Sequence, residues 1–164
     1  MAFSSVHEMI DLCKESGKPL YEVILESDLA ESGLTRAESE AEMHRLWAVM
    51  QATSDGYCGA DRSMSGFAGG DAAKVNAAAA RGVLYADGYF ADVMAEALKT
   101  AECNACMKRI VAAPTAGSCG VLPAVLVPLY QAGMVSEEQI IQALYTASGI
   151  GAVIGYRACI AGAA

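Results

Sequence analysis

The chain has 164 residues, a length typical of one domain or of a large part of one. Hydrophobic residues make up 54% of it and charged residues 18%, a balance that excludes an intrinsically disordered chain. The formal net charge of −8 excludes a strongly basic surface for nucleic acid, but it permits a local site for a small anion.

Small side chains dominate the composition, with 32 Ala and 16 Gly against 3 Phe and 1 Trp. Strands prefer branched and aromatic residues, whereas closely packed helices accommodate small ones. The sequence therefore predicts a mostly α fold, a multi-helix domain in which two glycine-rich loops lie at helix N-termini.

Three helices are predicted before residue 56. Ser or Thr followed three residues later by Glu forms a capping box, Gly ends a helix, and Pro is accepted in a first turn. These signals place the helices at about residues 4–16, 19–29 and 35–53.

A first glycine-rich loop follows over residues 56–70, where five glycines in fifteen residues exclude a helix. Asp71 is placed to cap a helix over residues 72–81. Another helix is expected over residues 89–99, with a continuation toward Cys106.

Residues 108–113 fit either a short strand or a continuing helix, because their periodicity favours neither. A second glycine-containing loop, residues 114–120, leads into a predicted helix over residues 121–130. Ser136 with Gln139 then predicts a capped last helix that ends near residue 154.

The last helix is long enough for a membrane span, since residues 139–156 carry no charge. Polar residues such as Gln142, Thr146 and Ser148 interrupt it, which favours a helix buried in a protein core. No leader with a basic region followed by an apolar one opens the chain, so a cytoplasmic location is expected. The six cysteines are then expected as reduced thiols or metal ligands rather than as disulfides.

Each glycine-rich loop precedes a helix start, where free N–H groups and the helix dipole favour a bound carboxylate, phosphate or sulfate. The alternative is that both loops are only sharp connections between helices. Neither carries a dinucleotide fingerprint or a P-loop ending, which disfavours a nucleotide. The candidate anion cradles are Ser65, Gly66, Gly69 and Gly70 in one loop and Thr115, Gly117, Ser118, Cys119 and Gly120 in the other.

Three further points concern chemistry. Asp71 either orients a substrate ammonium group or only caps the following helix. Cys103 and Cys106 have the spacing of metal and redox pairs, but two thiolates are too few for zinc or a [4Fe–4S] cluster, which favours a buried pair. Cys119 lies at a predicted helix entrance, where the pKa of its thiol is expected to be lowered.

The stretch from Cys103 to Leu126, with Ala-Pro-Thr-Ala-Gly at residues 113–117, resembles the core motif of the α subunit of iron–sulfur-dependent L-serine dehydratases. Residues 64–72, Met-Ser-Gly-Phe-Ala-Gly-Gly-Asp-Ala, are similar to that subunit's other glycine loop, which commonly reads Ser/Thr-Gly-Leu-Thr-Gly-Gly-Asp. The N-terminal helices also align, so the resemblance covers essentially the whole chain.

The resemblance implies an L-serine ammonia-lyase, in which α,β-elimination of water from L-serine yields pyruvate and ammonia without PLP. It implies a [4Fe–4S] cluster, held by three cysteines, as a Lewis acid on the β-hydroxyl group. It also implies a serine dehydratase β subunit or domain as partner. In the family the cluster ligands follow a block that residues 158–163 resemble, so they are expected beyond residue 164 and none is expected in this chain. Arg157 and Cys159 stand where the family commonly has Asn and Ser.

The resemblance also implies a substrate-binding half-site. Thr115, Gly117 and the N–H groups of residues 118–120 are expected to hold the serine carboxylate, opposite a wall formed by the first loop. Asn104 is expected to add a side-chain amide, and the catalytic base is not assigned. The half-site comprises Ser65, Gly66, Gly69, Gly70, Asp71, Asn104, Thr115, Gly117, Ser118, Cys119 and Gly120.

On this interpretation residues 1–164 form the N-terminal portion of the α-chain catalytic domain, a single and incomplete domain. It is expected to be inactive alone and to self-associate through apolar surface that its missing part would cover. The alternative is a non-catalytic helical module that binds a small anion or an amino acid. Neither nucleic acid nor a membrane is expected as a partner.

Overall fold

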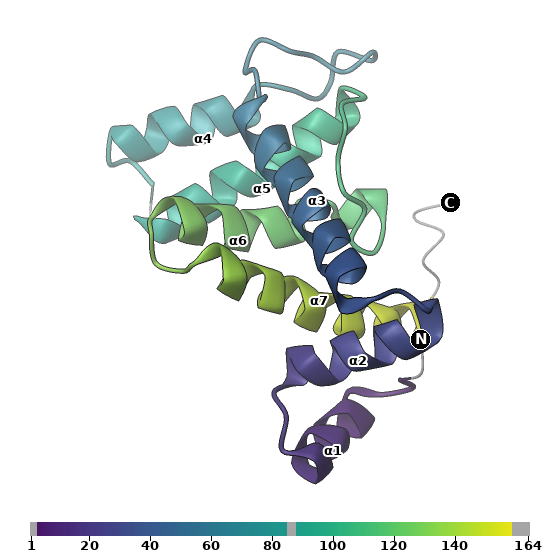
Figure 1. The fold of residues 1–164 in the computed structure, drawn as a ribbon. Helices are drawn as coiled ribbons and strands as arrows, with labels where there is room; N and C mark the ends of the chain where they lie inside the picture. Colours follow the sequence, from purple (N-terminus) through teal and green to yellow (C-terminus); the bar gives the residue numbers. More distant parts are fainter. Residues whose placement is uncertain (1–2, 85–87, 159–164) are drawn as a thin grey trace. The chain divides into compact units, whose positions relative to one another are not determined.

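The computed structural model describes residues 3–84 and 88–158, and within these ranges the chain forms seven α-helices and no β-strand (Figure 1). The prediction of a mostly α, multi-helix fold is confirmed. The described residues divide into two compact units. Unit 1 comprises residues 3–47 and 136–158, and unit 2 comprises residues 48–84 and 88–135.

Local capping residues in the sequence determine where helices of unit 1 begin and end. Its helices are α1 (Val6–Ser16), α2 (Leu20–Ser32), the first part of α3 (Arg36–Asp55) and α7 (Glu137–Arg157). Ser5 Oγ accepts a hydrogen bond from the Glu8 N–H at 3.2 Å, and Gly17 ends α1 in the left-handed conformation. Ser136 and Gln139 form the predicted capping box at the start of α7. The predicted helix starts are thus confirmed in this unit.

The core of unit 1 lies where α2 packs against α1 and α7. Its buried side chains are Phe3, Met9, Val23, Ile24 and Val153. A Cβ atom at Gly149 would lie 2.4 Å from Ile24 Cδ1, so the glycine permits the close approach of α7 to α2. Burial of α7 residues in this core agrees with the core-helix interpretation of residues 139–156. None of the helices in the described ranges is long and apolar enough to cross a membrane.

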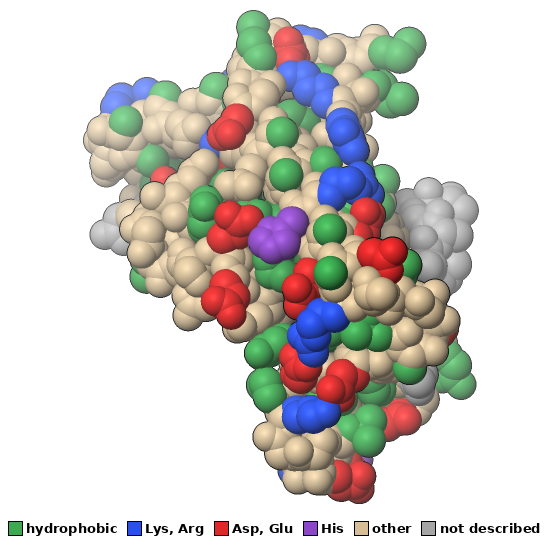
Figure 2. All heavy atoms as spheres, viewed as in Figure 1, with side chains coloured by type: hydrophobic (Ala, Val, Ile, Leu, Met, Phe, Trp, Pro, Cys, Tyr) green, Lys and Arg blue, Asp and Glu red, His purple; other side chains and the backbone are tan. Residues whose placement is uncertain are grey.

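Charged side chains on unit 1 form exposed ion pairs. Lys18 Nζ lies 2.6 Å from Glu26, and Arg36 pairs with Glu22 and with Glu40. Figure 2 shows this mixture of basic and acidic side chains over α2 and the beginning of α3. Such exposed pairs add little to stability, since solvent screens them.

Unit 2 is arranged around α5 (Tyr89–Ala105), which packs against α4 (Asp71–Ala80) and against α6 (Val121–Gln131) (Figure 1). The end of α3 belongs to the same unit. Two long loops, residues 56–70 and 106–120, connect these helices and contain the two glycine-rich segments. Both loops lead directly into a helix, as the sequence predicts.

Residues 108–113 correct one prediction, because they form neither a strand nor a continuation of α5. Cys106 caps α5, and Met107 has a φ of 59°, which ends the helix. The segment is then held by side chains, since Lys108 Nζ donates to the Gly56 carbonyl at 3.0 Å and Thr53 Oγ1 donates to the Arg109 carbonyl at 2.9 Å.

Candidate functional site

The first glycine-rich loop ends at the N-terminus of α4, and an internal carboxylate occupies the anion site there. Glu102, which is buried near the end of α5, accepts hydrogen bonds from the N–H groups of Gly70 at 2.9 Å, Asp71 at 2.6 Å and Ala72 at 3.3 Å. This is the arrangement expected for an anion at a helix N-terminus. This loop is predicted to bind a carboxylate at the start of its helix, and in the structure a carboxylate of the chain itself, that of Glu102, occupies this position.

Asp71 is not the cap of this helix, which corrects the prediction. Gly70 is the N-cap residue, and Asp71 is the first residue of α4. The Asp71 side chain instead forms an ion pair with Lys74 at 2.7 Å, and this hydrogen bond lowers the pKa of the Asp71 carboxyl. The N-cap is therefore residue 70 instead of the predicted residue 71. The Glu102 carboxylate, and not the Asp71 side chain, accepts the hydrogen bonds of the free N–H groups there.

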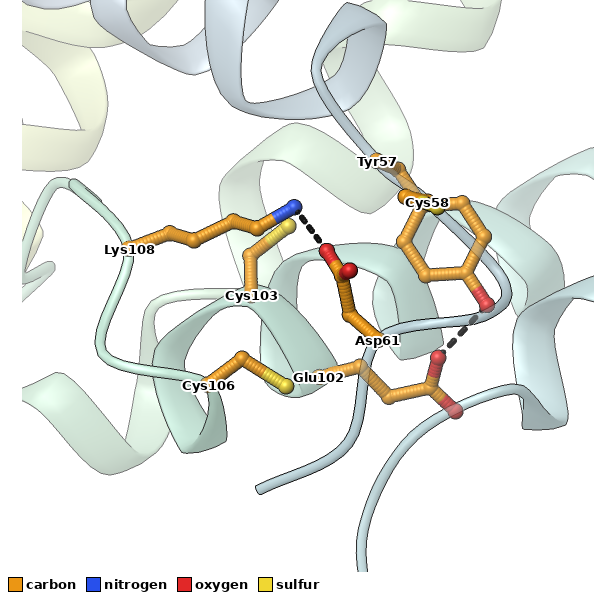
Figure 3. Close-up of a pocket in the computed structure, with 7 residues that line it drawn as sticks. All are labelled: Tyr57, Cys58, Asp61, Glu102, Cys103, Cys106 and Lys108. Atoms are coloured by element: carbon orange, nitrogen blue, oxygen red, sulfur yellow. Dashed lines mark hydrogen bonds and ion pairs between the residues drawn. The ribbon is translucent and has the colours of Figure 1, made fainter. Parts of the chain in front are cut away.

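Tyr57 completes the environment of Glu102 (Figure 3). Its hydroxyl donates to Glu102 Oε2 at 2.6 Å, and burial together with this hydrogen bond raises the pKa of Tyr57 to about 12. Beside it, Lys108 Nζ and Asp61 form an ion pair that lowers the pKa of the Asp61 carboxyl. Two contacts between residues distant in sequence therefore hold the first loop against the end of α5 and the segment that follows it.

The glycines of the first loop have structural reasons to be glycine. Gly69 has a φ of 130°, and a Cβ atom there would lie 2.2 Å from the Asp61 carbonyl oxygen. Gly70 has a φ of 85°, with the Gly59 carbonyl oxygen 3.0 Å from its Cβ position. Ser65 and Gly66 lie exposed at the loop tip, where the Ser65 hydroxyl is 3.1 Å from that of Ser63.

The second loop contains a short 3-10 helix, η1 (Ala116–Ser118), at its glycine-containing end. Thr115 and Ser118 form a capping box there, with Thr115 Oγ1 accepting from the Ser118 N–H at 3.3 Å. The Cys119 N–H donates to the Ala116 carbonyl at 3.3 Å. Two of the N–H groups predicted to hold a carboxylate, those of residues 118 and 119, are therefore used within the loop.

The lack of a side chain is needed for packing at Gly120 but not at Gly117. A Cβ atom at Gly120 would lie 2.9 Å from the Ala97 carbonyl oxygen, so this glycine lets the loop pack against α5. A Cβ atom at Gly117 would meet only Thr115 Oγ1, at an ordinary 3.7 Å. Gly117 is exposed, and its N–H has no acceptor within the described residues. The fold does not require glycine at position 117.

The start of α6 follows directly and lacks a side-chain cap of the kind seen at α4. Gly120 is its N-cap residue and offers no side-chain cap, and no side chain among the described residues is seen to accept a hydrogen bond there. Pro123, in the first turn, has no N–H to satisfy. Of the two predicted anion sites, the one at α4 is therefore filled by Glu102, whereas the one at η1 and α6 has no protein carboxylate assigned to it.

The last turn of α5 joins the two loops. Glu102 holds the first loop, and Asn104 Nδ2 donates to the Ala116 carbonyl of the second loop at 3.0 Å. Sequence reasoning chose Asn104 as a source of a side-chain amide, and that amide positions the loop. It missed Glu102 and Tyr57, because nothing in the local sequence links them to a helix that starts at residue 71. The available signal in the sequence was that Glu102, a charged residue, adjoins Cys103, for which burial was expected.

Among the cysteines of unit 2, Cys103 and Cys119 are buried, Cys106 is half-buried and Cys58 is exposed. Burial raises the pKa of Cys119, so the prediction of a lowered pKa is wrong. The helix-entrance effect is outweighed because the side chain is buried in the core. Burial also raises the pKa of Cys103, whose Sγ lies 3.7 Å from the Thr53 carbonyl oxygen.

The described cysteines do not fit a metal cluster. Cys58, Cys103 and Cys106 line the small pocket of Figure 3, but no group of three or more Cys, His, Asp or Glu side chains in the described ranges is arranged to hold a metal ion. A [4Fe–4S] cluster needs three or four thiolate ligands. Cys159 and the block at residues 158–163 lie outside the described residues, apart from Ala158.

Comparison with known proteins places the chain in a family. The family model described as "Serine dehydratase alpha chain" matches residues 15–164. The chain belongs to this family. The family match agrees with the resemblance carried by the two glycine-rich loops, both of which lie within the matched residues.

Individual serine dehydratase relatives match nearly the whole chain. It is 32% identical to the "Probable L-serine dehydratase, alpha chain" of Bacillus subtilis over 162 residues, which are 99% of this chain and 54% of that protein. It is 34% identical to the "L-serine dehydratase, alpha chain" of Peptoniphilus asaccharolyticus over 161 residues, 98% of this chain and 55% of that protein. The chain thus spans about half the length of these relatives. No solved structure matches it significantly.

Proposed function

We propose that the chain is part of an L-serine ammonia-lyase and supplies the half-site that binds the substrate carboxylate. In this reaction L-serine loses water to give aminoacrylate, which becomes an imine and is hydrolysed to pyruvate and ammonia. The family match over residues 15–164 is the observation that carries the proposal. The names of the relatives from Bacillus subtilis and Peptoniphilus asaccharolyticus support the substrate.

The second loop is the proposed carboxylate site. The N–H of Gly117 has no protein acceptor within the described residues, and the start of α6 has no side-chain cap. Thr115 and Ser118 fix the backbone of η1, and Asn104 fixes it from α5. These contacts preorganise the donors, so that binding a carboxylate requires little loss of backbone freedom. The lack of a side chain at Gly117 leaves the approach open.

The first loop is the proposed opposing wall. Glu102 already occupies the N–H groups of Gly70 and Asp71, so these two residues support the wall rather than bind the substrate. Ser65 and Gly66, at the exposed tip, are the members of the loop that we assign to substrate contact.

We assign no described cysteine to the implied [4Fe–4S] cluster and derive no step through it, because the described residues do not fit it. The proposal likewise leaves the base that takes the α-proton outside residues 1–164. It includes a β subunit as the partner that completes the enzyme, a cytoplasmic location, and no activity for this chain alone.

Calorimetric titration of the chain with L-serine tests the half-site directly. L-Serine methyl ester is the matched ligand, since it keeps the ammonium and hydroxyl groups but has no carboxylate. We expect L-serine to bind at least about tenfold more tightly than the ester, as charge-assisted hydrogen bonds require. Equal affinities for the two ligands would contradict a carboxylate site.

The variant Gly117→Val tests the assignment of the loop. Its side chain fills the proposed approach but meets no backbone, so we expect serine binding to weaken at least about tenfold while the melting temperature changes by less than about 3 °C. Gly151→Val is the control, because a Cβ atom at Gly151 meets nothing within 4 Å and Gly151 lies outside the proposed site. Unchanged binding by Gly117→Val would remove this glycine from the site.

Pyruvate release from L-serine separates the enzyme from the alternative, a non-catalytic module that binds a small anion or an amino acid. The full-length gene product is combined with a β subunit and handled without oxygen, because the cluster ligands are expected beyond residue 164. Turnover that Gly117→Val abolishes supports the ammonia-lyase. Serine binding without turnover in that complex favours the module.

A further inference from the structure

The paired cysteines at the end of α5 have no role in the proposed half-site. Cys103 and Cys106 are free thiols that both line the small pocket of Figure 3, beside the ion pair of Lys108 and Asp61. Cys103 is 2% exposed, whereas Cys106 is half-buried, so reagents in solution reach Cys106 first. An accessible thiol next to an enclosed one is the arrangement that suits reversible disulfide chemistry.

The two cysteines span the cap that ends α5. The Lys108 N–H donates to the Cys103 carbonyl at 2.9 Å, and the Met107 N–H donates to the Asn104 carbonyl at 3.0 Å, which together form a Schellman motif. Glycine is usual at the left-handed position of this motif, but here Met107 occupies it with a φ of 59°. A residue other than glycine is strained in this conformation. The last turn of α5 is therefore held by a weak cap.

A disulfide between these cysteines does not fit an intact last turn. Residues three apart on a helix have Cβ atoms about 5–6 Å apart, whereas a disulfide requires about 3.8 Å. The turn from Cys103 to Cys106 must therefore change its backbone conformation to close the bond. Cys103 Sγ must also leave the Thr53 carbonyl oxygen, which lies 3.7 Å away. The oxidised pair and the observed helix end are therefore alternatives.

The turn that must change carries the attachments of both glycine-rich loops. Glu102, immediately before Cys103, accepts hydrogen bonds from the N–H groups at the start of α4. Asn104, between the two cysteines, donates to the Ala116 carbonyl of the second loop at 3.0 Å. A backbone change in this turn displaces both side chains, so the state of the thiols is linked to the attachment of both loops.

We propose that Cys103 and Cys106 form a reversible disulfide switch, whose oxidation unwinds the last turn of α5 and releases both glycine-rich loops from it. The oxidant is a low-molecular-weight disulfide such as oxidised glutathione. The Cys106 thiolate attacks it, forms a mixed disulfide and displaces one thiolate; the Cys103 sulfur then attacks the Cys106 sulfur, forms the protein disulfide and displaces the second. Two electrons pass from the protein to the reagent, and the two thiol protons pass to the displaced thiolates.

The surroundings of Cys103 agree with this order of attack. Burial raises the pKa of the Cys103 thiol, Lys108 acts in the opposite direction, and the neighbouring Cys106 raises the pKa further. The contribution of Cys106 disappears once that residue carries the mixed disulfide. Lys108 then favours the Cys103 thiolate at the moment when it is needed for the second attack.

Peptide mass spectrometry of the chain, equilibrated with glutathione at ratios from fully reduced to fully oxidised, tests the disulfide. Trypsin cleaves after Lys99 and Lys108, so both cysteines lie in one peptide, residues 100–108. As the ratio becomes oxidising, we expect this peptide to escape alkylation and to be lighter by two hydrogen atoms than its reduced form. Dithiothreitol should reverse the change.

Hydrogen exchange tests the release of the helix end and of the first loop. The amides of Asp71 and Lys108 donate to Glu102 and to the Cys103 carbonyl in the reduced chain. We expect both amides to exchange at least about tenfold faster in the oxidised chain, whereas the amides of α2 in unit 1 keep their rates.

Three variants assign the effect to this pair. Cys106→Ser and Cys103→Ser are each expected to abolish the disulfide and the faster exchange. Cys58→Ser is the matched control, because Cys58 lines the same pocket but lies outside α5, and it should keep both effects. Cys106 is half-buried, so its variant keeps the test decisive if Cys103→Ser fails to fold.

Three results would overturn the proposal. One is glutathione attached to Cys106, or a disulfide that includes Cys58, with no bond between Cys103 and Cys106 at any ratio. Another is a Cys103–Cys106 disulfide that leaves the exchange of Asp71 and Lys108 unchanged. The third is faster exchange that persists in oxidised Cys106→Ser.

The consequence for the substrate rests on the proposed function. If the second loop binds the serine carboxylate, oxidation should weaken L-serine binding at least about tenfold. The disulfide and the hydrogen exchange are measured without serine, which separates the two proposals. A reduced chain that does not bind serine, but that shows the disulfide and the faster exchange on oxidation, supports the switch and contradicts the half-site.

Discussion

Replacing Glu102 should destabilise unit 2 more than any exposed charge change. The carboxylate accepts four hydrogen bonds, from the N–H groups of Gly70, Asp71 and Ala72 and from the Tyr57 hydroxyl, at 2.6 to 3.3 Å. It is 6% exposed, so water cannot replace these bonds in a variant that keeps the fold. The substitution Glu102→Gln removes the charge with little change of shape.

The size of the destabilisation follows from how the four hydrogen bonds are divided between the two carboxylate oxygens of Glu102. Oε1 accepts from Asp71 and Ala72, whereas Oε2 accepts from Gly70 and Tyr57. Glutamine keeps one oxygen, and its amide nitrogen faces the Gly70 N–H as a second donor. We therefore expect Glu102→Gln to lower the free energy of unfolding by about 1.5–3 kcal/mol, and Glu102→Ala, which removes all four bonds, by about 3–5 kcal/mol.

Urea unfolding followed by circular dichroism measures this change, and hydrogen exchange of the Gly70 to Ala72 amides locates it. Glu15→Gln is the matched control, because Glu15 is exposed, and its effect should stay within about 0.5 kcal/mol. If Glu102→Gln were as stable as the control, with the three amides equally protected, Glu102 would not be the cap of α4. The account of the first loop would then be wrong.

Three further predictions concern unit 2. The pKa of Tyr57 is raised to about 12 from an ordinary value near 10, so the stabilising effect of its hydroxyl is full below pH 10 and is lost as the pH rises to 12. The difference in unfolding free energy between the wild type and Tyr57→Phe should therefore shrink between pH 10 and 12. A difference that stays constant over this range would contradict the prediction. Gly120→Ala should cost about 1–3 kcal/mol in unfolding free energy because its Cβ meets the Ala97 carbonyl oxygen, whereas Gly151→Ala should cost nothing measurable. Iodoacetamide should alkylate the exposed Cys58 in the native chain well before the buried Cys119, as mass spectrometry of peptides would show; equal rates would refute the burial of Cys119.

The exposed apolar tip of the first loop bears on the predicted self-association. Met64 and Phe67 are 98% and 95% exposed, and Figure 2 shows hydrophobic side chains projecting from this loop. If the chain associates through this tip, the double variant Met64→Ser, Phe67→Ser should shift sedimentation toward the monomer. A wild-type chain that is monomeric at all concentrations would end this prediction.

Local signals made the helices predictable from the sequence. The starts of α1, α3 and α7 depend on capping contacts three residues apart, so both partners are read in one short window. The start of α4 depends on Glu102, which is 31 residues from Asp71 in sequence, and the sequence-based cap was accordingly placed on the wrong residue. Tyr57 was missed for a similar reason, since it is 45 residues from Glu102 in sequence.

Motif position was a better guide to the loops than to the roles of their residues. Residues 114–120 form the expected loop before a helix, but the N–H groups of Ser118 and Cys119 donate to acceptors within that loop. The sequence also did not distinguish its two glycines, whereas in the structure a Cβ atom would approach the backbone of α5 at Gly120 and no backbone at Gly117. The thiol pKa of Cys119 was misjudged because burial depends on the packing of distant segments, which spacing does not report.

The shared anchor on α5 limits how the two loops can be moved to another scaffold. Glu102 and Asn104 lie two residues apart, and a shift of one residue in the register of α5 would rotate both side chains by about 100°. Both loops would then lose their attachment in a single event. A transplanted loop would need its own part of α5, so the smallest portable form of the proposed half-site runs from Tyr57 to Gly120 as one continuous piece.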